Sequence, residues 1–99
     1  MVRIPIDKER IAAFCRDNHI KRLAFFGSVL RDDFTPESDV DVLVEFEEGH
    51  TPGLFGLSRA ENELSDLLGR KADLNTIGFL SKHYRDRVAR EAEVLYDAA

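Results

Sequence analysis

The sequence predicts an α/β protein of the α+β kind, in which helices pack on a small mixed β-sheet of about four strands. Apolar residues recur at strand-like period two in some segments and at helix-like spacings of three and four in others. The expected order is helix, strand, strand, helix, strand, helix, strand, which a mixed sheet covered by helices accommodates. With 99 residues, 43% hydrophobic and 33% charged, we expect one ordinary globular domain over residues 1–99.

The first helix is expected over residues 8–18, with Asp7 as its N-terminal cap. Ile11, Phe14 and Cys15 lie three and four positions apart and form its apolar stripe. Cys15 is therefore interpreted as a core residue and not as a reactive thiol.

Two strands are expected next. Residues 22–26 are apolar at both alternating sets of positions, as in an inner strand that is covered on both faces, and this strand ends at Gly27. Residues 29–36 are mostly polar and predict a surface loop with room for a short helical turn. Residues 39–46 have a period of two, which places one set on the core face and the other set on the opposite face: Val40, Val42, Val44 and Phe46 against Asp39, Asp41, Leu43 and Glu45.

The second half of the chain is again expected to alternate between helices and strands. A helix is expected over residues 54–68, ended by Gly69, and its stripe consists of Leu57, Ala60, Leu64, Leu67 and Leu68. A short strand over residues 72–77, a helix capped by Ser81 and an edge strand over residues 94–96 complete the order. The apolar stripe of that last helix is Tyr84, Val88 and Ala92.

Charge and cysteine content exclude several classes of function. The formal net charge is −5, so a nucleic-acid backbone would be repelled and direct binding to nucleic acid is not expected. A single cysteine excludes an internal disulfide, and no cluster with the spacing of a zinc site exists among Cys15, His19, His50 and His83. No apolar stretch has the length of a signal peptide or a membrane span, so a cytoplasmic protein without membrane contact is expected.

The pattern with chemical content is Gly27-Ser28, ten further residues, and then Asp39-Val40-Asp41. Two aspartates at positions i and i+2 of a strand lie on the same side, roughly 6.5 to 7 Å apart. Their mutual repulsion is relieved by a divalent cation, and oxygen-only ligands favour Mg²⁺ or Mn²⁺ over zinc. The other interpretation is a solvated strand end.

A glycine that follows an inner strand allows a phosphate to approach the backbone closely, and the Ser28 hydroxyl can donate to phosphate oxygens. Arg31 is the nearest cation to this turn, and Asp73 is a third metal ligand if its strand lies beside that of Asp39 and Asp41. A simple turn at Gly27-Ser28 and surface roles for Arg31 and Asp73 are the alternatives.

Together, this spacing and a downstream acid in a short strand resemble the DNA polymerase β nucleotidyltransferase superfamily. The chain is most similar to its minimal nucleotidyltransferase branch, the MNT antitoxins encoded beside HEPN-domain toxins. The resemblance covers nearly the whole chain, so residues 1–99 would be one minimal nucleotidyltransferase domain. One departure is Asp32-Asp33, which stands where members often place a glycine soon after the position of Arg31.

The resemblance implies AMP transfer from ATP with two Mg²⁺ ions, for which Mn²⁺ is a possible substitute. Asp39, Asp41 and Asp73 would be the catalytic metal ligands, with Asp73 helping to remove the proton of the attacking oxygen. Gly27 and Ser28 would hold the β and γ phosphates, and Arg31 would contact the nucleotide. The acceptor would be a tyrosine of the HEPN-domain toxin, which is silenced in a hetero-oligomer that supplies part of the site.

Two alternatives stay open: a non-catalytic antitoxin that neutralises the toxin by binding alone, and a free-standing small-molecule nucleotidyltransferase, which the short chain disfavours. Glu45 ranks below Asp73 as a ligand because it lies farther along its strand. The basic residues of the last helix have two interpretations: a surface that contacts nucleotide phosphates or an acidic partner, and a solvated face. These residues are Lys82, His83, Arg85, Arg87 and Arg90.

Overall fold

The computed structural model describes residues 6–30, 35, 38–76, 86, 88 and 90–98. Its sheet has four strands in the order β3-β2-β1-β4. The strands are β1 (Ile20–Phe26), β2 (Val40–Phe46), β3 (Ala72–Thr76) and β4 (Glu93–Asp97). β1 pairs antiparallel with β2 and with β4, whereas β2 pairs parallel with β3. The predicted mixed sheet is confirmed, with β1 as an inner strand and β4 at an edge.

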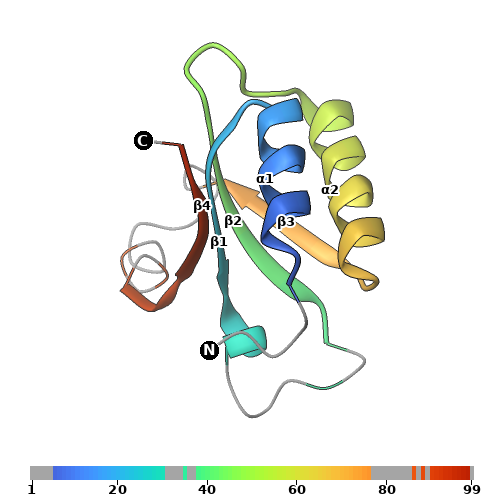
Figure 1. Ribbon diagram of the computed structural model, residues 1–99, viewed down its shortest axis with the longest axis vertical. Coiled ribbons are helices and arrows are strands. Elements are labelled where there is room, and N and C mark those ends of the chain that lie inside the picture. Colours follow the sequence, from blue (N-terminus) through green and yellow to red (C-terminus); the bar gives the residue numbers. More distant parts are fainter. Residues whose placement is uncertain are drawn as a thin grey trace.

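Two helices, α1 (Lys8–Asp17) and α2 (Leu54–Leu68), lie side by side on one face of this sheet (Figure 1). α1 begins where it was predicted, because the Asp7 carboxylate accepts hydrogen bonds from the backbone N–H groups of Glu9 and Arg10 at 3.1 and 3.2 Å. α2 ends at Gly69, whose φ of 73° is a left-handed conformation that glycine adopts without steric cost.

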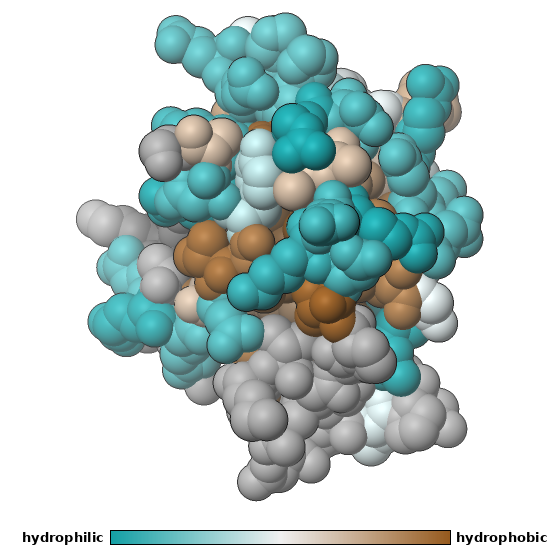
Figure 2. Space-filling model, in the orientation of Figure 1, coloured by the Kyte–Doolittle hydropathy of each residue, from teal (hydrophilic) through white to brown (hydrophobic). Residues whose placement is uncertain are grey.

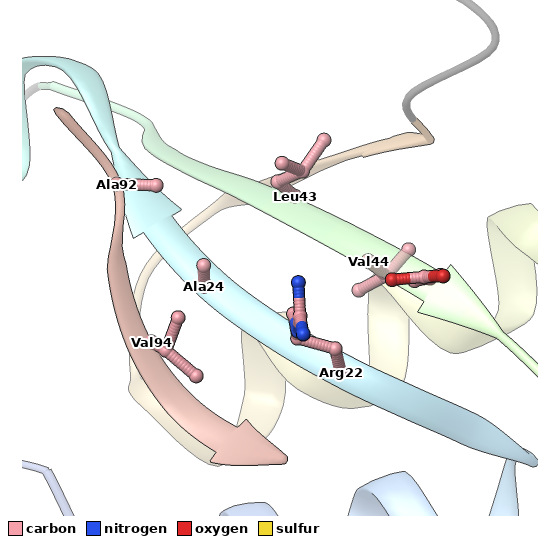
Figure 3. A pocket seen from close by; sticks show the side chains of 7 residues that line it. Arg22, Ala24, Leu43, Val44, Ala92 and Val94 are labelled. Carbon is pink, nitrogen blue, oxygen red and sulfur yellow. The ribbon is translucent and has the colours of Figure 1, made fainter. Parts of the chain in front are cut away.

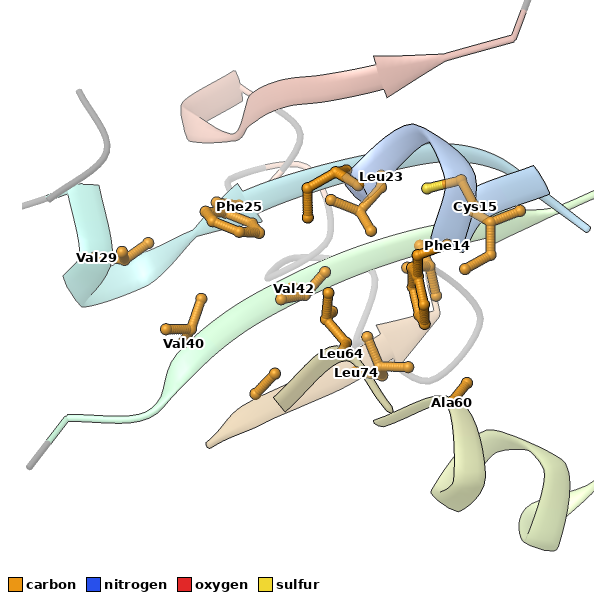
Figure 4. Close-up of a cluster of buried hydrophobic side chains, with 14 residues drawn as sticks. Phe14, Cys15, Leu23, Phe25, Val29, Val40, Val42, Ala60, Leu64 and Leu74 are labelled. Carbon is orange, nitrogen blue, oxygen red and sulfur yellow. The ribbon is translucent and has the colours of Figure 1, made fainter. Parts of the chain in front are cut away.

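The core lies between these helices and the sheet (Figure 4). Alternate residues of β2 point into it, as the period of two predicts, and the remaining residues of this strand point to the opposite face. The α2 stripe is confirmed, since Ala60 and Leu64 are buried and the three other leucines pack against the cluster. The buried members of the cluster are Ile11, Phe14, Cys15, Ile20, Leu23, Phe25, Val29, Val40, Val42, Val44, Ala60, Leu64, Ala72 and Leu74.

The predicted loop over residues 29–36 begins with a short helical turn, as that prediction allows, but the predicted surface position of Val29 is wrong. Residues Gly27–Leu30 form a 3₁₀ turn, η1, and Val29 within it is completely buried. The tight turn directs Val29 back over the end of the core near Phe25 and Val40 (Figure 4). Burying an apolar side chain of this size is worth about 1.5 to 3 kcal/mol, so the turn is anchored to the core.

The outer side of the helices is mostly polar, although Leu54 and Phe55 at the start of α2 are exposed. Figure 2 shows, in the orientation of Figure 1, a surface made mainly of hydrophilic side chains with smaller hydrophobic areas between them. This is the expected exterior of two amphipathic helices. Within the described part of the chain, none of the helices has the length and apolar character needed to cross a membrane.

Most of the predicted last helix lies outside the described residues, including its cap Ser81, its stripe residue Tyr84 and most of its basic residues. Of its predicted stripe, Val88 is described and buried. The backbone N–H of Ala92 donates to the carbonyl of Val88 at 2.9 Å, immediately before β4 begins.

Candidate functional site

The two aspartates of the motif lie at the start of β2. Asp39 directly precedes this strand and Asp41 is its second residue. Because Val40 and Val42 are fully buried in the core, the alternation of the strand places Asp41 on the opposite face of the sheet. Asp41 is half-buried, and the side chain of Asp39 is 43% exposed. This arrangement is consistent with the prediction that Asp39 and Asp41 lie outside the core.

The third acid lies on the neighbouring strand. In the parallel pairing of β2 with β3, Asp41 is the register partner of Asp73. Adjacent strands are about 4.8 Å apart and register partners project to the same face, so the two carboxylates lie side by side. The condition that the sequence left open, that the strand of Asp73 lies beside that of Asp41, is therefore met.

Gly27 touches this pair from the other side. It follows β1, in which Phe26 is the register partner of Asp41, and it has a φ of +77°. A Cβ added to Gly27 would collide with Oδ2 of Asp41 and would lie 3.3 Å from its Cγ. Glycine is thus required here both by the backbone conformation and by the closeness of the carboxylate.

The other residues of the predicted phosphate site are only partly described. The backbone of Ser28 belongs to the 3₁₀ turn, beside Gly27. Arg31 lies outside the described residues, as do Asp32 and Asp33. The structure therefore brings Gly27, the backbone of Ser28 and the aspartates to one end of the sheet, where η1 and the beginning of β2 meet (Figure 1).

Lys71 forms an ion pair with Asp39, with 3.9 Å between Nζ and Oδ2. Its carbonyl also accepts a hydrogen bond from the backbone N–H of Val40 at 2.9 Å. The side chain of Lys71 is 68% exposed, so the pair contributes little to stability. Sequence reasoning did not identify this residue, because its place follows from the pairing of Val40 with Ala72, which brings the preceding residues Asp39 and Lys71 side by side.

The donor atoms at this end of the sheet are carboxylate oxygens, the ligands that Mg²⁺ accepts. In the described part of the chain, no three His, Cys, Asp or Glu side chains are placed closely enough to hold a metal ion by themselves. Mg²⁺ usually takes only one or two protein carboxylates and completes its shell with water and phosphate oxygens. Asp41 together with Asp39, or Asp41 together with Asp73, provides the two carboxylates that one Mg²⁺ ion accepts.

α2 holds β3 on both sides of Asp73. Oε2 of Glu61 accepts a hydrogen bond from the backbone N–H of Leu74, and Oγ of Ser65 accepts one from that of Ala72, both at 2.9 Å. The Ser65 hydroxyl itself donates to the carbonyl of Glu61 at 2.7 Å. These positions are four apart and thus share one helix face, a signal that was present in the sequence but not used.

Glu45 lies away from the aspartates. It is four residues beyond Asp41 on the same strand, a separation of about 13 Å. Its carboxylate oxygen Oε1 is 3.7 Å from Nζ of Lys21. Its lower rank as a ligand agrees with this position.

Cys15 is a core residue, as predicted, and is completely buried. Removal from water raises the pKa of its thiol to about 12, against a smaller opposing effect of the Arg16 charge. A thiol with so high a pKa is protonated at neutral pH, which argues against nucleophilic chemistry.

A pair of histidines was missed by the sequence reasoning. The rings of His19 and His50 stack with their centroids 4.0 Å apart, and Nδ1 of His19 is 4.0 Å from Oε2 of Glu47. His19 precedes β1 and Glu47 follows β2, so this pair lies at the end of the sheet opposite to the aspartates. It is separate from the candidate site.

Comparisons with known proteins agree with this geometry. A protein adenylyltransferase of Thermococcus cleftensis, MntA, is 36% identical over 72 residues, which cover 73% of this chain and 71% of the relative. The solved structure of a candidate minimal nucleotidyltransferase is 36% identical, with a TM-score of 0.73 and coverage of 87% of this chain and 86% of the other.

Two solved complexes share the fold at lower identity. One is a toxin–antitoxin complex with AMP-PNP, at 20% identity and a TM-score of 0.76, covering 93% of this chain and 74% of the other. The second is a tri-AMPylated HEPN toxin of Shewanella oneidensis bound to its MNT antitoxin, at 20% identity and a TM-score of 0.67, covering 91% and 69%.

The family model described as a nucleotidyltransferase domain matches residues 8–96. This range contains Gly27, Ser28 and all three aspartates of the candidate site. The chain belongs to the nucleotidyltransferase domain family.

Proposed function

We propose that this chain is an Mg²⁺-dependent protein adenylyltransferase and that it is the antitoxin of a HEPN-domain toxin encoded beside it. It transfers AMP from ATP to a tyrosine hydroxyl of the toxin, with residues 1–99 acting as one minimal nucleotidyltransferase domain in a hetero-oligomer. The observation that carries this proposal is the pairing of Asp41 with Asp73, with Gly27 packed against the Asp41 carboxylate.

Gly27 and Ser28 hold the β and γ phosphates of ATP. Gly27 begins the 3₁₀ turn directly after β1, and N–H groups of this turn can donate to phosphate oxygens. Arg31, three residues farther on, is proposed as a further phosphate contact. The triphosphate and the three carboxylates are all negatively charged, so cations are needed between them.

Asp39 and Asp41 would hold one Mg²⁺ ion, and Asp41 with Asp73 would hold a second, with Mn²⁺ as a possible substitute. The oxygen-only donor set and the adjacency of Asp41 and Asp73 support this assignment. When bound, the ions neutralise charge on the triphosphate and polarise its phosphorus–oxygen bonds.

The transfer step is an in-line displacement. The tyrosine oxygen forms a bond to the α-phosphorus, the bond from this phosphorus to the oxygen bridging to the β-phosphorus breaks, and pyrophosphate leaves. The tyrosine proton passes to the carboxylate of Asp73 and then to water. Asp73 is exposed, so both an acceptor side chain and water can reach it.

Related proteins support the donor and the partner. One relative is named a protein adenylyltransferase, one complex of the same fold contains AMP-PNP, and another contains an AMPylated HEPN toxin.

Lys71 would release Asp39 when the cation and the triphosphate bind, since its ion pair is exposed and weak.

The test uses the HEPN-domain protein encoded next to this chain. Incubated with the chain, Mg²⁺ and ATP, it should gain the mass of one or more AMP groups, as measured by mass spectrometry of the intact partner. Asp41→Asn should abolish this gain. Asp66→Asn, which removes an exposed acid on α2, should leave it unchanged.

A partner that is inhibited but unmodified by the wild-type chain would overturn the enzymatic proposal and favour neutralisation by binding alone. Modification that persists in Asp41→Asn would show that the assigned site is wrong.

A further inference from the structure

A hollow of about 110 Å³ lies on the face of the sheet that also carries Asp41 (Figure 3). Its apolar lining includes Ala24 of β1, Leu43 of β2 and Val94 of β4. Arg22 and Glu45, which are register partners, stand at the end farther from Asp41. Ala24 is a small residue between Arg22 and Phe26 on this face of β1, and its side chain is buried.

The distance from the carboxylates is short. Ala24 is paired with Leu43, and the next pair on the same face is Phe26 with Asp41. Same-face pairs follow one another at roughly 6.5 to 7 Å along a strand. A molecule that binds at Asp41 and extends along β2 therefore enters the hollow after one such step.

We infer that this hollow binds the heterocyclic base of the nucleotide donor, an inference that rests on the proposed function. In a nucleoside triphosphate the ribose separates the α-phosphate from the base, and this spacer is comparable to one same-face step. The ring of a tyrosine acceptor is bonded directly to its hydroxyl oxygen. A tyrosine ring in the hollow would leave that oxygen too far from the phosphorus held at Asp41.

The lining suits a planar heterocycle. Leu43 and Val94 offer apolar contact to the faces of a ring, while Arg22 and Glu45 offer polar groups to its edge. NH2 of Arg22 is 3.4 Å from Oδ2 of Asp97, and Oε1 of Glu45 is 3.7 Å from Nζ of Lys21. A guanidinium has five N–H donors and a carboxylate several lone pairs, which leaves capacity for a ligand.

Glu45 also favours one class of base. An ionised carboxylate only accepts hydrogen bonds, so it binds an exocyclic amino group and is repelled by a carbonyl oxygen. The ring N–H of uracil lies between two carbonyl oxygens, whereas the amino group of adenine has none beside it. The inferred donor is accordingly a nucleotide whose base carries an amino group, as adenine does, in preference to one with uracil.

The test fills the hollow and separates the base from the phosphates. Val94→Phe and Ala24→Leu each place extra carbon atoms in it, and Val94 is 50% exposed, so its replacement is compatible with folding. The dissociation constants of ATP and of inorganic tripolyphosphate are measured with Mg²⁺ for the complex of the chain with its HEPN-domain partner. ATP binding should weaken about tenfold, which corresponds to ~1.4 kcal/mol, while tripolyphosphate binding stays unchanged.

The matched control is Thr51→Leu, in a second hollow beside the start of α2 that includes Phe46 and Pro52. It should change neither constant. In addition, Glu45→Ala should narrow the preference for ATP over UTP.

Unchanged ATP affinity in folded Val94→Phe would overturn the inference. So would a higher KM for the acceptor protein with an unchanged ATP constant, because the acceptor would then occupy the hollow. If the wild-type chain bound neither ATP nor tripolyphosphate, the proposed function would fail together with the inference. If the wild-type chain transferred AMP normally and the ATP dissociation constants of Val94→Phe and Ala24→Leu were unchanged, only the inference would fail.

Discussion

Oε2 of Glu61, in the middle of α2, accepts a hydrogen bond from the backbone N–H of Leu74 at 2.9 Å. Leu74 follows Asp73, and the residue before Asp73 is bound in the same way by Ser65. β3 is an edge strand of the sheet that the described residues form, and within it no strand lies on the outer side of β3 to accept these N–H groups. α2 thereby fixes the backbone that carries Asp73 beside Asp41.

Replacing Glu61 tests this role. Glu61→Ala leaves a partly buried N–H without its acceptor, and we expect the free energy of unfolding to fall by about 1 to 3 kcal/mol. Because Asp73 loses its fixed position, kcat should fall while the KM for ATP changes little. Glu61→Gln retains an acceptor oxygen and should recover most of both losses.

Glu63→Ala is the control, because Glu63 lies on the exposed side of the same helix. Denaturant unfolding and steady-state kinetics of the partner's modification measure the two effects. Equal kcat values for Glu61→Ala and the wild-type chain would show that Glu61 has no positioning role.

Gly27→Ala should both destabilise the protein and abolish transfer. The alanine would adopt a φ of +77° and its Cβ would collide with the Asp41 carboxylate. The double variant Gly27→Ala/Asp41→Ala removes the collision, since Cβ of Asp41 is 3.5 Å away, and should recover part of the stability but no activity.

Gly69→Ala separates conformational strain from collision. Its φ is +73° and nothing lies within 4 Å of an added Cβ, so only the strain of a left-handed residue applies, about 1 to 2 kcal/mol. Thermal unfolding of the three variants provides the comparison. A loss in Gly27→Ala no greater than that in Gly69→Ala would contradict the proximity of Gly27 to Asp41.

Asp41→Asn should lose activity, because it removes a carboxylate that neighbours those of Asp39 and Asp73. Mg²⁺ with a non-hydrolysable ATP analogue should stabilise the wild-type chain, by ~2.7 kcal/mol when the ligand concentration is about one hundred times Kd. The variant should show no such gain, and a gain equal to that of the wild-type chain would exclude Asp41 as a ligand.

Cys15 should make the protein less stable at alkaline pH. Burial raises the pKa of its thiol to about 12, above that of a thiol in the unfolded chain. Above the unfolded pKa, the unfolded state releases a proton that the folded state keeps. Stability should therefore fall as pH rises through this window, by about 1.4 kcal/mol per pH unit at most.

Urea unfolding between about pH 8 and about pH 10.5 measures this slope, and Cys15→Ala should reduce it. The comparison isolates Cys15, because all other titrating groups are common to both proteins. Identical slopes would contradict the linkage. Iodoacetamide should not modify the folded wild-type protein at pH 8, since the thiol is buried and protonated.

Local signals in the sequence account for most elements of the fold. Asp7 can satisfy the first N–H groups of α1, Gly69 can adopt a positive φ, and the alternation around Val40 and Val42 fixes which face each residue of β2 uses. These effects act within a few residues and are therefore visible in the sequence. The polar residues from Arg31 to Asp33 predict a surface loop at Val29, whereas the burial of Val29 depends on contacts with residues distant in the chain.

The sequence by itself determined the residue types of the candidate site and the face of β2 on which Asp41 lies. Only the tertiary structure decided that Asp73 is the register partner of Asp41, that Gly27 touches the same carboxylate, and that α2 holds β3. Strand order and register arise from packing between segments far apart in the chain, and no local pattern encodes those contacts.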